Sequence, residues 1–373
     1  MVFKNLNVYN TIWIHADSLS EVKACRQLIF ELLKVYHKEV FILTSNTLEG
    51  VNAAKKISSK LIVQYFPFDV PHIVSRFFLA FRPALIIFIK TEFYPNILSQ
   101  ARKKGIPVIM ANGILSQKLY KRTKRYRIFF RKELSAIKAV CAQTENDMNR
   151  FIHLKFKNVI NASNLMFSLD IPDFDPIVMR KNLRYSKKDF IITIGNTHEG
   201  EDEIGKILYH NLKNLIPNLK IIIIPRHINR IPQILAEYSD NEYTLYSKVV
   251  KYKPFLIVDE INLLPQFYAT SDISIIGGSF CEHEGHNPLQ AIWYEKAVIV
   301  GPNHKTYKSV IEKLQEEKAI IISDIDNITN DVLRLYNNEE YKNNMGKKAK
   351  KVLEENKQAL QKHMEVIKTY IEL

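Results

Sequence analysis

The chain has 373 residues, of which 46% are hydrophobic and 25% charged, and its formal net charge is +14. This composition excludes a disordered or fibrous chain and supplies enough apolar side chains for the cores of two ordinary domains. Three widely spaced cysteines, Cys25, Cys141 and Cys281, form no CxxC pair, which argues against a zinc site or a disulfide framework. No signal peptide is visible, and no apolar run is long enough to cross a membrane, so we expect any membrane contact to be peripheral.

The first half of the sequence alternates short apolar runs with helical patterns. We expect strands at 11–16, 40–43, 61–65, 85–89, 107–110, 139–143 and 158–162, and helices at 22–36, 48–58, 71–81 and 95–104. Repeated strand–helix units with wholly apolar strands predict a parallel, doubly wound sheet. Polar residues follow the expected strands directly at 17–21, 90–92 and 112–116, where such sheets form their ligand crevice.

The second half repeats this architecture after a polar segment, 168–189, that we interpret as a linker. Further strands are expected at 191–194, 220–224, 255–258, 273–276, 298–300 and 319–322. The predicted fold class is therefore α/β, with two Rossmann-like doubly wound domains at 1–167 and 168–340. A charged helical segment at 341–373 is expected to pack on the outside.

Residues 271–308 combine a strand, a glycine turn, a helix, a second strand and a second glycine turn. Asn287 suits the N-cap of that helix and Pro288 its first position. A helix start beside the turn Gly277-Gly278-Ser279 offers free backbone N–H groups to an anion, most often a phosphate. An ordinary βαβ unit also needs Gly and Pro in its turns, and the spacing is neither GxGxxG nor a P-loop, so both readings stay open.

Two further loops of the second half follow strands, at 196–202 and 225–227. Arg226 suits a phosphate group, and the hydroxyls of Thr197 and Ser279 can donate hydrogen bonds. His198 and Glu199 resemble a metal pair, but no HxxxH or DxD pattern completes it. A buried structural histidine is the better interpretation of His198.

Two carboxylates of the first half, Glu21 and Glu92, stand at expected strand ends. A carboxylate near a helix N-terminus has its charged form favoured, which suits a base. Glu21 can equally be a capping residue, and Glu92 can serve only to hold a neighbouring loop. The residues alone leave these alternatives open.

Residues 117–132 hold eight Lys or Arg side chains interleaved with Tyr and Phe. Three readings compete: a solvated helix face, contact with an anionic lipid surface, and nucleic-acid binding. Nucleic acid comes third because no recognised nucleic-acid motif accompanies the stretch.

These loops occur in one order along the chain: IWIHADSLSEV, KTEFYPNIL, ANGILSQ, AQTENDMNRF, GNTHEGEDE, PRHINR, GGSFCEHEGHNPLQA and GPNHKTY. As an ordered set, from about residue 11 to 315, they resemble the 3-deoxy-D-manno-octulosonic acid (Kdo) transferases, which add Kdo to the lipid A precursor. The resemblance implies a GT-B fold, in which two Rossmann-like domains flank an interdomain cleft. It also implies an inverting glycosyl transfer from CMP-Kdo without a bound metal or other cofactor.

Matched motif by motif, the resemblance implies roles for individual residues. Glu21 matches the catalytic Glu that takes the acceptor proton, and Glu92 matches a second acidic residue of the family. The residues expected to bind the donor are Thr197, Arg226, His227, Gly277, Gly278, Ser279, Gly285, His286, Asn287 and Gln290. Ser18, Lys121, Arg122 and Arg125 are assigned to the acceptor or the membrane. The first domain is expected to bind the acceptor and the second the CMP moiety.

The sequence departs from the family pattern at Ser20, Lys90, Ile114, Ser163, Met166, Glu284, Gln290 and Thr306. We also expect it to lack the usual N-terminal anchor. We therefore expect a divergent Kdo transferase of lipopolysaccharide biosynthesis. It would sit peripherally on the cytoplasmic face of the bacterial inner membrane, held through 117–132, with no nucleic-acid partner. The alternatives are a paralogue with another donor or acceptor, or a non-catalytic nucleotide- or glycolipid-binding protein of the same fold.

Overall fold

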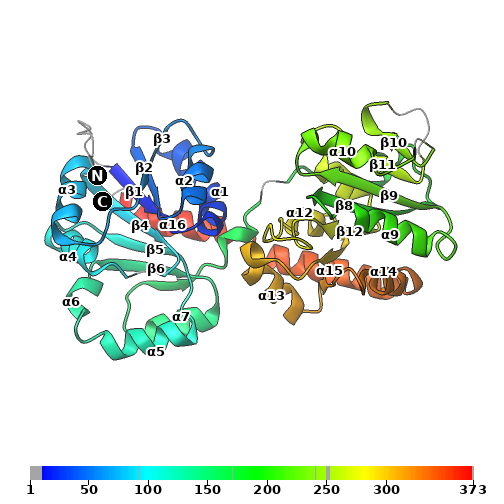
Figure 1. Cartoon of the computed structure of the whole chain (residues 1–373). Coiled ribbons are helices and arrows are strands. Elements are labelled where there is room, and N and C mark those ends of the chain that lie inside the picture. The colour runs from blue at the N-terminus through cyan, green and yellow to red at the C-terminus, as the bar shows by residue number, and fades with distance from the viewer. Residues whose placement is uncertain (1–10, 92, 170, 240, 249–252, 372–373) are drawn as a thin grey trace. The chain divides into compact units, whose positions relative to one another are not determined.

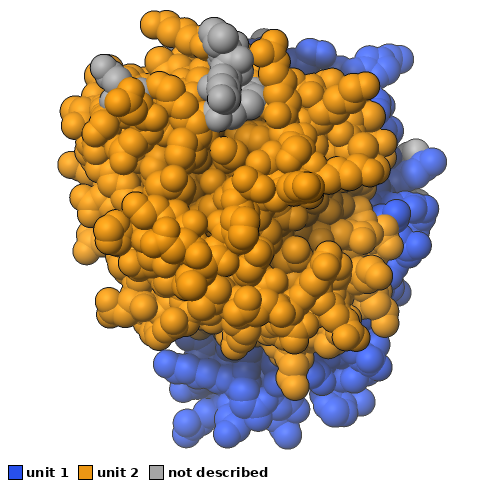
Figure 2. Space-filling model, turned by 90° about the vertical axis from the view of Figure 1, so that its right-hand side faces the viewer, with its two compact units in different colours: residues 1–169, 356–373 blue, residues 170–355 orange. Residues whose placement is uncertain are grey.

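The computed structural model describes the chain apart from residues 1–10, 92, 170, 240, 249–252 and 372–373 (Figure 1). Two compact units make up the chain, and Figure 2 colours them separately. Unit 1 comprises residues 1–169 and 356–373, and unit 2 comprises residues 170–355. Each unit is an α/β fold around one parallel sheet, which confirms the predicted fold class.

Within the described residues, the sheet of unit 1 has seven parallel strands in the order β3-β2-β1-β4-β5-β6-β7. Its strands are β1 (Thr11–His15), β2 (Val40–Ser45), β3 (Leu61–Tyr65), β4 (Pro83–Ile89), β5 (Val108–Gly113), β6 (Ile137–Ala142) and β7 (Val159–Asn161). Along β1, Trp13 packs on one face of the sheet, and Ile12 and Ile14 pack on the other. Burial on both faces explains why these strands appear in the sequence as continuous apolar runs.

Helices cover both faces of this sheet (Figure 1). They are α1 (Leu19–Val35), α2 (Leu48–Lys55), α3 (Pro71–Phe81), α4 (Pro95–Lys103), α5 (Gln117–Tyr126), α6 (Arg131–Leu134), α7 (Glu145–His153) and α16 (Ala359–Ile371). The four helices expected between the early strands are confirmed to within three residues at each end.

The described sheet of unit 2 also has seven parallel strands, in the order β10-β11-β9-β8-β12-β13-β14. They are β8 (Phe190–Thr197), β9 (Leu219–Pro225), β10 (Tyr243–Leu245), β11 (Phe255–Ile257), β12 (Ile273–Ile276), β13 (Ala297–Val300) and β14 (Ile321–Ile322). All six strands expected in this half are present. The edge strand β10 was not predicted, because only Thr244 of its three residues is buried.

The helices of unit 2 are α8 (Pro176–Asn182), α9 (Glu203–Leu212), α10 (Ile231–Leu235), α11 (Leu264–Thr270), α12 (Leu289–Ile292), α13 (Lys308–Glu316), α14 (Ile328–Asn337) and α15 (Glu339–Asn356). Part of the segment interpreted as a linker, 168–189, is therefore the helix α8, capped by the Asp175 carboxylate. Arg180 of α8 pairs with Asp272 at 2.6 Å, which ties this helix to unit 2.

The charged C-terminal segment is divided between the two units. Met345 and Leu353 of α15 are buried in unit 2, whereas Ile367 of α16 joins the core of unit 1. His363 of α16 is fully buried, and its Nε2 accepts the backbone N–H of Asn112 at 2.9 Å. The helix α16 is thus part of the core of unit 1, although packing on the outside was expected.

Each of the two sheets has a topological switch point. Strand order reverses between β1 and β4 in unit 1 and between β8 and β12 in unit 2. At such a switch point the loops that leave neighbouring strands run to opposite faces, which leaves a crevice at the carboxyl ends. No helix in the described part of the chain is long and apolar enough to span a bilayer.

Candidate functional site

In unit 1, the loop after β1 places Glu21 at the switch point. The strand ends at His15, α1 begins at Leu19, and Glu21 lies buried in the first turn of that helix. Its Oε2 accepts the backbone N–H of Asp17 at 2.7 Å, and its Oε1 lies 3.3 Å from the Nζ of Lys90, which follows β4. The carboxylate thus holds its own loop, as a capping residue does, and also pairs with the neighbouring strand.

Opposing effects set the pKa of the Glu21 carboxyl. Burial raises the pKa of its carboxyl to about 7, and the nearby Lys90 ammonium and the Asp17 N–H oppose that rise. A carboxyl with a pKa near neutrality is well matched to taking up a proton from a hydroxyl during a reaction. The local environment of Glu21 therefore suits a general base.

His15, the last residue of β1, is a buried residue beside this loop that sequence reasoning missed. Its Nδ1 lies 3.1 Å from the carbonyl oxygen of Thr44 and must therefore donate, which leaves Nε2 to accept from the Tyr94 hydroxyl at 3.1 Å. Burial lowers the pKa of His15 to about 3, so the ring is neutral. Its ring stacks on Phe66 at 3.8 Å between centroids. The signal that could have found it is its position as the last residue of an apolar strand.

The remaining predicted residues of unit 1 are less closely grouped. Ser18 is the N-cap of α1, with no capping hydrogen bond from its side chain to the described chain. Glu92 lies outside the described residues. Lys121, Arg122 and Arg125 are exposed along α5, whose N-cap Ser116 accepts the N–H of Leu119. The solvated helix face is thus observed, and membrane contact stays a prediction.

In unit 2, one buried carboxylate, that of Glu201, organises the loops after β8 and β12. It accepts three backbone N–H groups: those of His198 at 2.9 Å, Gly278 at 2.6 Å and Phe280 at 2.9 Å. Glu201 is 2% exposed. Sequence reasoning missed this role, because the residue looks like one more acid in an acidic loop.

The glycine turn is shaped by close backbone approach. A Cβ at Gly277 would lie 2.4 Å from the Asn196 oxygen, and Gly278 has a φ of 69°, so both positions need glycine. The N–H of Gly277 donates to the Gly195 oxygen at 2.8 Å, and that of Gly278 donates to Glu201. The expectation that these N–H groups are free is therefore not met. The Ser279 hydroxyl is also occupied, since it bonds the Ile276 oxygen and accepts the Gly301 N–H at 2.7 Å.

The loops after β8 and β9 are locked together through Thr197. Its hydroxyl donates to Asp202 at 2.5 Å, and Asp202 forms an ion pair with Arg230. The Thr197 carbonyl accepts the backbone N–H of Arg226 at 3.0 Å. The side chains of Arg226 and His227 are exposed at the carboxyl end of β9. Thr197 is thus structural, and Arg226 is positioned to meet a ligand.

A pocket of about 320 Å³ opens at this edge of the sheet of unit 2. Its polar lining includes Asn196, Arg226, Glu260, Asn262 and Gln290. The pocket has the size of a small-molecule site and brings together two predicted donor residues, Arg226 and Gln290. Glu260 and Asn262 were not predicted, although they lie within four residues of the end of the expected strand 255–258.

Beside the glycine turn lies a cluster of histidines. The Nε2 atoms of His198 and His286 are 2.8 Å apart, so one ring donates its N–H there and the other accepts the hydrogen bond. Burial first, and then the nearby His283 and His227, lower the pKa of His198 to about 4. The interpretation of His198 as a buried, hydrogen-bonded residue is confirmed. Among the described residues, no group of three or more His, Cys, Asp or Glu side chains is arranged to hold a metal ion.

The segment that leads into α12 differs in detail from the prediction. Pro288 is the N-cap, and Asn287 accepts the N–H of Leu289 at 3.0 Å. The helix α12 is only four residues long, so its dipole is weaker than expected. Gly285 has a φ of 80°, and its N–H donates to the Gly278 oxygen at 2.7 Å, which closes the loop on the glycine turn.

Comparison with known proteins assigns the chain to a family. Residues 2–169 match the family described as 3-deoxy-D-manno-octulosonic-acid transferase (kdotransferase), and residues 175–352 match glycosyl transferases group 1. The 3-deoxy-D-manno-octulosonic acid transferase of Haemophilus influenzae is 29% identical over 97% of this chain and 87% of its own length. The enzyme of the same name from Rickettsia bellii is 28% identical over 95% of this chain and 87% of its own length.

A bifunctional glycosyltransferase/methyltransferase of Fusobacterium nucleatum is 28% identical over 85% of this chain, and the match spans 51% of that relative. Two solved structures share the fold at 15% identity. MurG of Acinetobacter baumannii has a TM-score of 0.59 over 96% of this chain and 99% of its own. UDP-GlcNAc 2-epimerase from Neisseria meningitidis has a TM-score of 0.54 over 97% of this chain and 100% of its own. The family matches and the curated relatives together show that this chain belongs to the Kdo transferase family of glycosyltransferases.

Proposed function

We propose that the chain transfers Kdo from CMP-Kdo to a lipid A precursor or a related glycolipid, as an inverting glycosyltransferase of lipopolysaccharide biosynthesis. The observation that carries this proposal is the buried Glu21 carboxyl at the switch point of unit 1, with a pKa of about 7. The relatives from Haemophilus influenzae and Rickettsia bellii are Kdo transferases that match most of this chain, which supports the choice of donor and acceptor.

In the proposed reaction, Glu21 accepts the proton of the acceptor hydroxyl as that oxygen attacks the anomeric carbon of Kdo. The bond from this carbon to the phosphate oxygen breaks, and CMP leaves with the bonding electrons. The Lys90 ammonium favours the ionised form of Glu21. Glu92 is proposed as a second acidic residue of the site. Ser18 and the rest of 1–167 are proposed to serve the acceptor.

The segment 168–340 is proposed to bind the donor, with 341–373 as a helical C-terminal extension. The Arg226 guanidinium supplies charge for the leaving phosphate, as a fixed cation does for developing negative charge. Gln290, His227 and Glu260 line or flank the 320 Å³ pocket and would meet the nucleoside. The side chains of His286 and Asn287 and the backbone at Gly277, Gly278, Ser279, Gly285 and Thr197 would shape its floor.

Peripheral contact with an anionic membrane is proposed for the exposed cations of α5, on the cytoplasmic face of the inner membrane. Lys121, Arg122 and Arg125 face solvent, and Ile128 and Phe129 are 84% and 77% exposed just beyond the helix. Between α5 and its neighbours lies an apolar pocket of about 180 Å³, lined in part by Phe93, Leu98 and Phe130. Exposed cations beside exposed apolar side chains are typical of an interfacial surface.

The test is transfer from CMP-Kdo to a lipid A precursor, followed by release of CMP. The Glu21→Gln variant should lose transfer by at least roughly a hundredfold, the usual contribution of a positioned base, and should keep its affinity for CMP. The partly exposed Glu31→Gln on the same helix is the matched control. Retained transfer in Glu21→Gln would remove this residue as the base. CMP binding without transfer in the wild type would favour a non-catalytic binding protein.

A further inference from the structure

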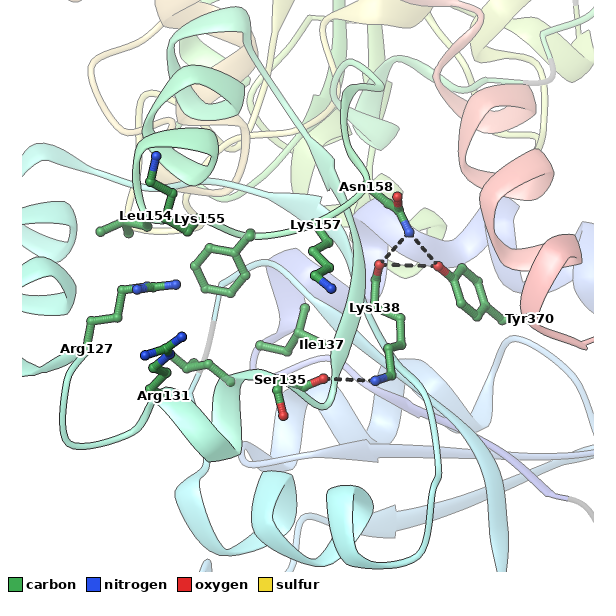
Figure 3. A pocket seen from close by; sticks show the side chains of 12 residues that line it. Arg127, Arg131, Ser135, Ile137, Lys138, Leu154, Lys155, Lys157, Asn158 and Tyr370 are labelled. Carbon is green, nitrogen blue, oxygen red and sulfur yellow. Dashed lines mark hydrogen bonds between the residues drawn. The ribbon is translucent and has the colours of Figure 1, made fainter.

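A second polar pocket lies in unit 1, at the amino ends of β6 and β7. All strands of this sheet are parallel, and Glu21 lies at their carboxyl ends, so the pocket lies at the opposite ends of the strands. The pocket has a volume of about 480 Å³. Its polar walls come from four elements (Figure 3): Arg127 and Arg131 near α6, Lys138 of β6, Lys155 and Lys157 before β7, and Tyr370 of α16.

The charge of this pocket is one-sided. Five of the described lining residues are Lys or Arg, and none is Asp or Glu. In the part of the chain that the structure describes, none of these five side chains forms an ion pair with a carboxylate. Gathering like charges around a concave surface raises the local concentration of anions and leaves the cations without a counter-charge until one binds.

The side chain of Arg127 gives a second, independent observation in favour of anion binding. Its Nε is buried, and it has no hydrogen-bond partner among the described residues. A buried donor without a partner is unfavourable, and a movement of the Arg127 side chain toward an anionic oxygen in the pocket would satisfy it.

The wall opposite Arg127 is already ordered. The Asn158 amide donates to the Lys138 carbonyl at 3.0 Å and to the Tyr370 hydroxyl at 3.1 Å, and the Tyr370 hydroxyl donates to the same carbonyl at 3.2 Å. The Lys138 Nζ donates to the Ser135 oxygen at 3.0 Å (Figure 3). A wall held this way does not have to be organised when a ligand arrives, which lowers the entropic cost of binding.

We propose that this pocket binds an anion that carries two or more phosphate groups. Phosphate oxygens match the fork of donors on arginine and the point charges of lysine, and the volume is that of a small-molecule site. Ile128 and Phe129, which lie between Arg127 and Arg131 in the chain, are 84% and 77% exposed. Such side chains can enter the apolar layer of a bilayer while the pocket holds a headgroup, which favours a phosphate carried on a lipid.

This pocket lies at the amino ends of the strands, whereas Glu21 lies at their carboxyl ends. The inference therefore does not rest on the proposed transfer reaction. Two sources of the same chemistry are separated by using two probes on the full-length chain. One is inorganic tripolyphosphate, followed by calorimetry. The other is phosphatidylcholine vesicles with a minor fraction of cardiolipin, whose headgroup carries two phosphates, followed by co-sedimentation.

The pocket variant is Lys138→Gln/Lys155→Gln/Lys157→Gln, three exposed positions whose neutralisation leaves the core intact. The matched control is Lys55→Gln/Lys56→Gln/Lys60→Gln, which removes the same charge from exposed positions next to β3, the opposite edge strand of this sheet. The pocket variant should lose at least about tenfold in affinity, because each lost charged hydrogen bond is strong, and the control should stay within about twofold.

Binding of tripolyphosphate that the pocket variant loses supports the proposal with a soluble ligand. Binding of cardiolipin vesicles alone, lost in the same variant, supports it with a lipid ligand. The proposal is overturned if the wild type binds neither probe. It is also overturned if the two triple variants lose affinity equally, because binding would then follow only the overall charge of the chain.

Discussion

The Nζ of Lys90 lies 3.3 Å from the Oε1 of Glu21, and this pair joins the loops that leave β4 and β1. Glu21 is buried, whereas the Lys90 side chain is 42% exposed, so the carboxylate bears most of the desolvation. The Kdo transferase resemblance places an acidic residue at position 90, and this chain has a cation there instead. The substitution counteracts the effect of burial on the pKa of Glu21.

Neutralising Lys90 should therefore weaken the proposed base at neutral pH. In Lys90→Gln, the pKa of Glu21 rises above its present value of about 7, since the Lys90 charge is the largest influence that lowers it. The acidic limb of kcat/KM against pH should move to higher pH by at least roughly half a pH unit. The exposed Lys103→Gln is the control, and superimposable profiles of Lys90→Gln and the wild type would contradict the expected coupling.

Glu21 should also make stability depend on pH. The pKa of its carboxyl is about 7 in the folded chain, above the ordinary value of 4.5, so the folded state holds this proton more tightly than the unfolded state. Its stabilising contribution is complete below about pH 4.5 and is lost as pH rises to about 7, by roughly 3 kcal/mol at most. Urea unfolding of the wild type and Glu21→Gln should diverge across this window. Parallel pH profiles would refute it.

Glu201 should be needed for the stability of unit 2. In Glu201→Gln, the amide nitrogen cannot accept a hydrogen bond, so at least one of the three backbone N–H groups loses its partner. Losing a buried, charged acceptor should lower the free energy of unfolding by about 2 kcal/mol. Exposed Glu203→Gln, two residues along the chain, should change it by less than about 0.5 kcal/mol. Equal small effects in denaturant unfolding would argue against an organising role for Glu201.

Arg226 should contribute to nucleotide affinity without contributing to stability. Its side chain is exposed at the 320 Å³ pocket. Arg226→Ala should raise the Kd for CMP by roughly tenfold or more, because a charged hydrogen bond to phosphate is lost. Calorimetry with CMP measures this change. Lys188→Ala, near the amino end of β8, should leave the Kd for CMP unchanged. An equal loss of affinity in both variants would show that only the net charge matters.

Two departures from the family pattern have a backbone signature. Ser163 and Glu284 replace glycines of the pattern and have φ values of 64° and 59°. A non-glycine residue in this region costs about 1–2 kcal/mol, part of which glycine loses again through the entropy of the unfolded chain. The Glu284 carboxylate lies 3.5 Å from the hydroxyl of Thr306, a third departure, so two replaced residues contact each other.

Ser163→Gly should accordingly raise the free energy of unfolding by about 0.5 kcal/mol. The same chemical change in the middle of α4, Ser99→Gly, should lower it by about 0.5–1 kcal/mol, since glycine weakens a helix interior. Chemical denaturation of the two variants gives the signs directly. A destabilised Ser163→Gly would show that the serine side chain makes a contribution larger than the backbone strain.

Much of each unit could be predicted from local pattern. A strand that is buried on both faces needs an unbroken apolar run, and such a run can be recognised in the sequence. All thirteen strands that we expected are present. The edge strand β10 was not predicted, because a strand at the edge of a sheet does not need an unbroken apolar run. The four-residue α12 was overestimated, because Asn and Pro mark where a helix begins and say little about its length.

By itself, the sequence determined the order of the strands along the chain, the polar loops at their carboxyl ends, and the family. These follow from periodicity and from ordered motifs, which are properties of neighbours in the chain. Only the tertiary structure decided which loops meet: Glu21 with Lys90, Glu201 with the glycine turn, and α16 with the core of unit 1. Burial and pairing depend on residues distant in sequence. For that reason the raised pKa of Glu21 and the occupied N–H group of Gly278 had no signature in the sequence.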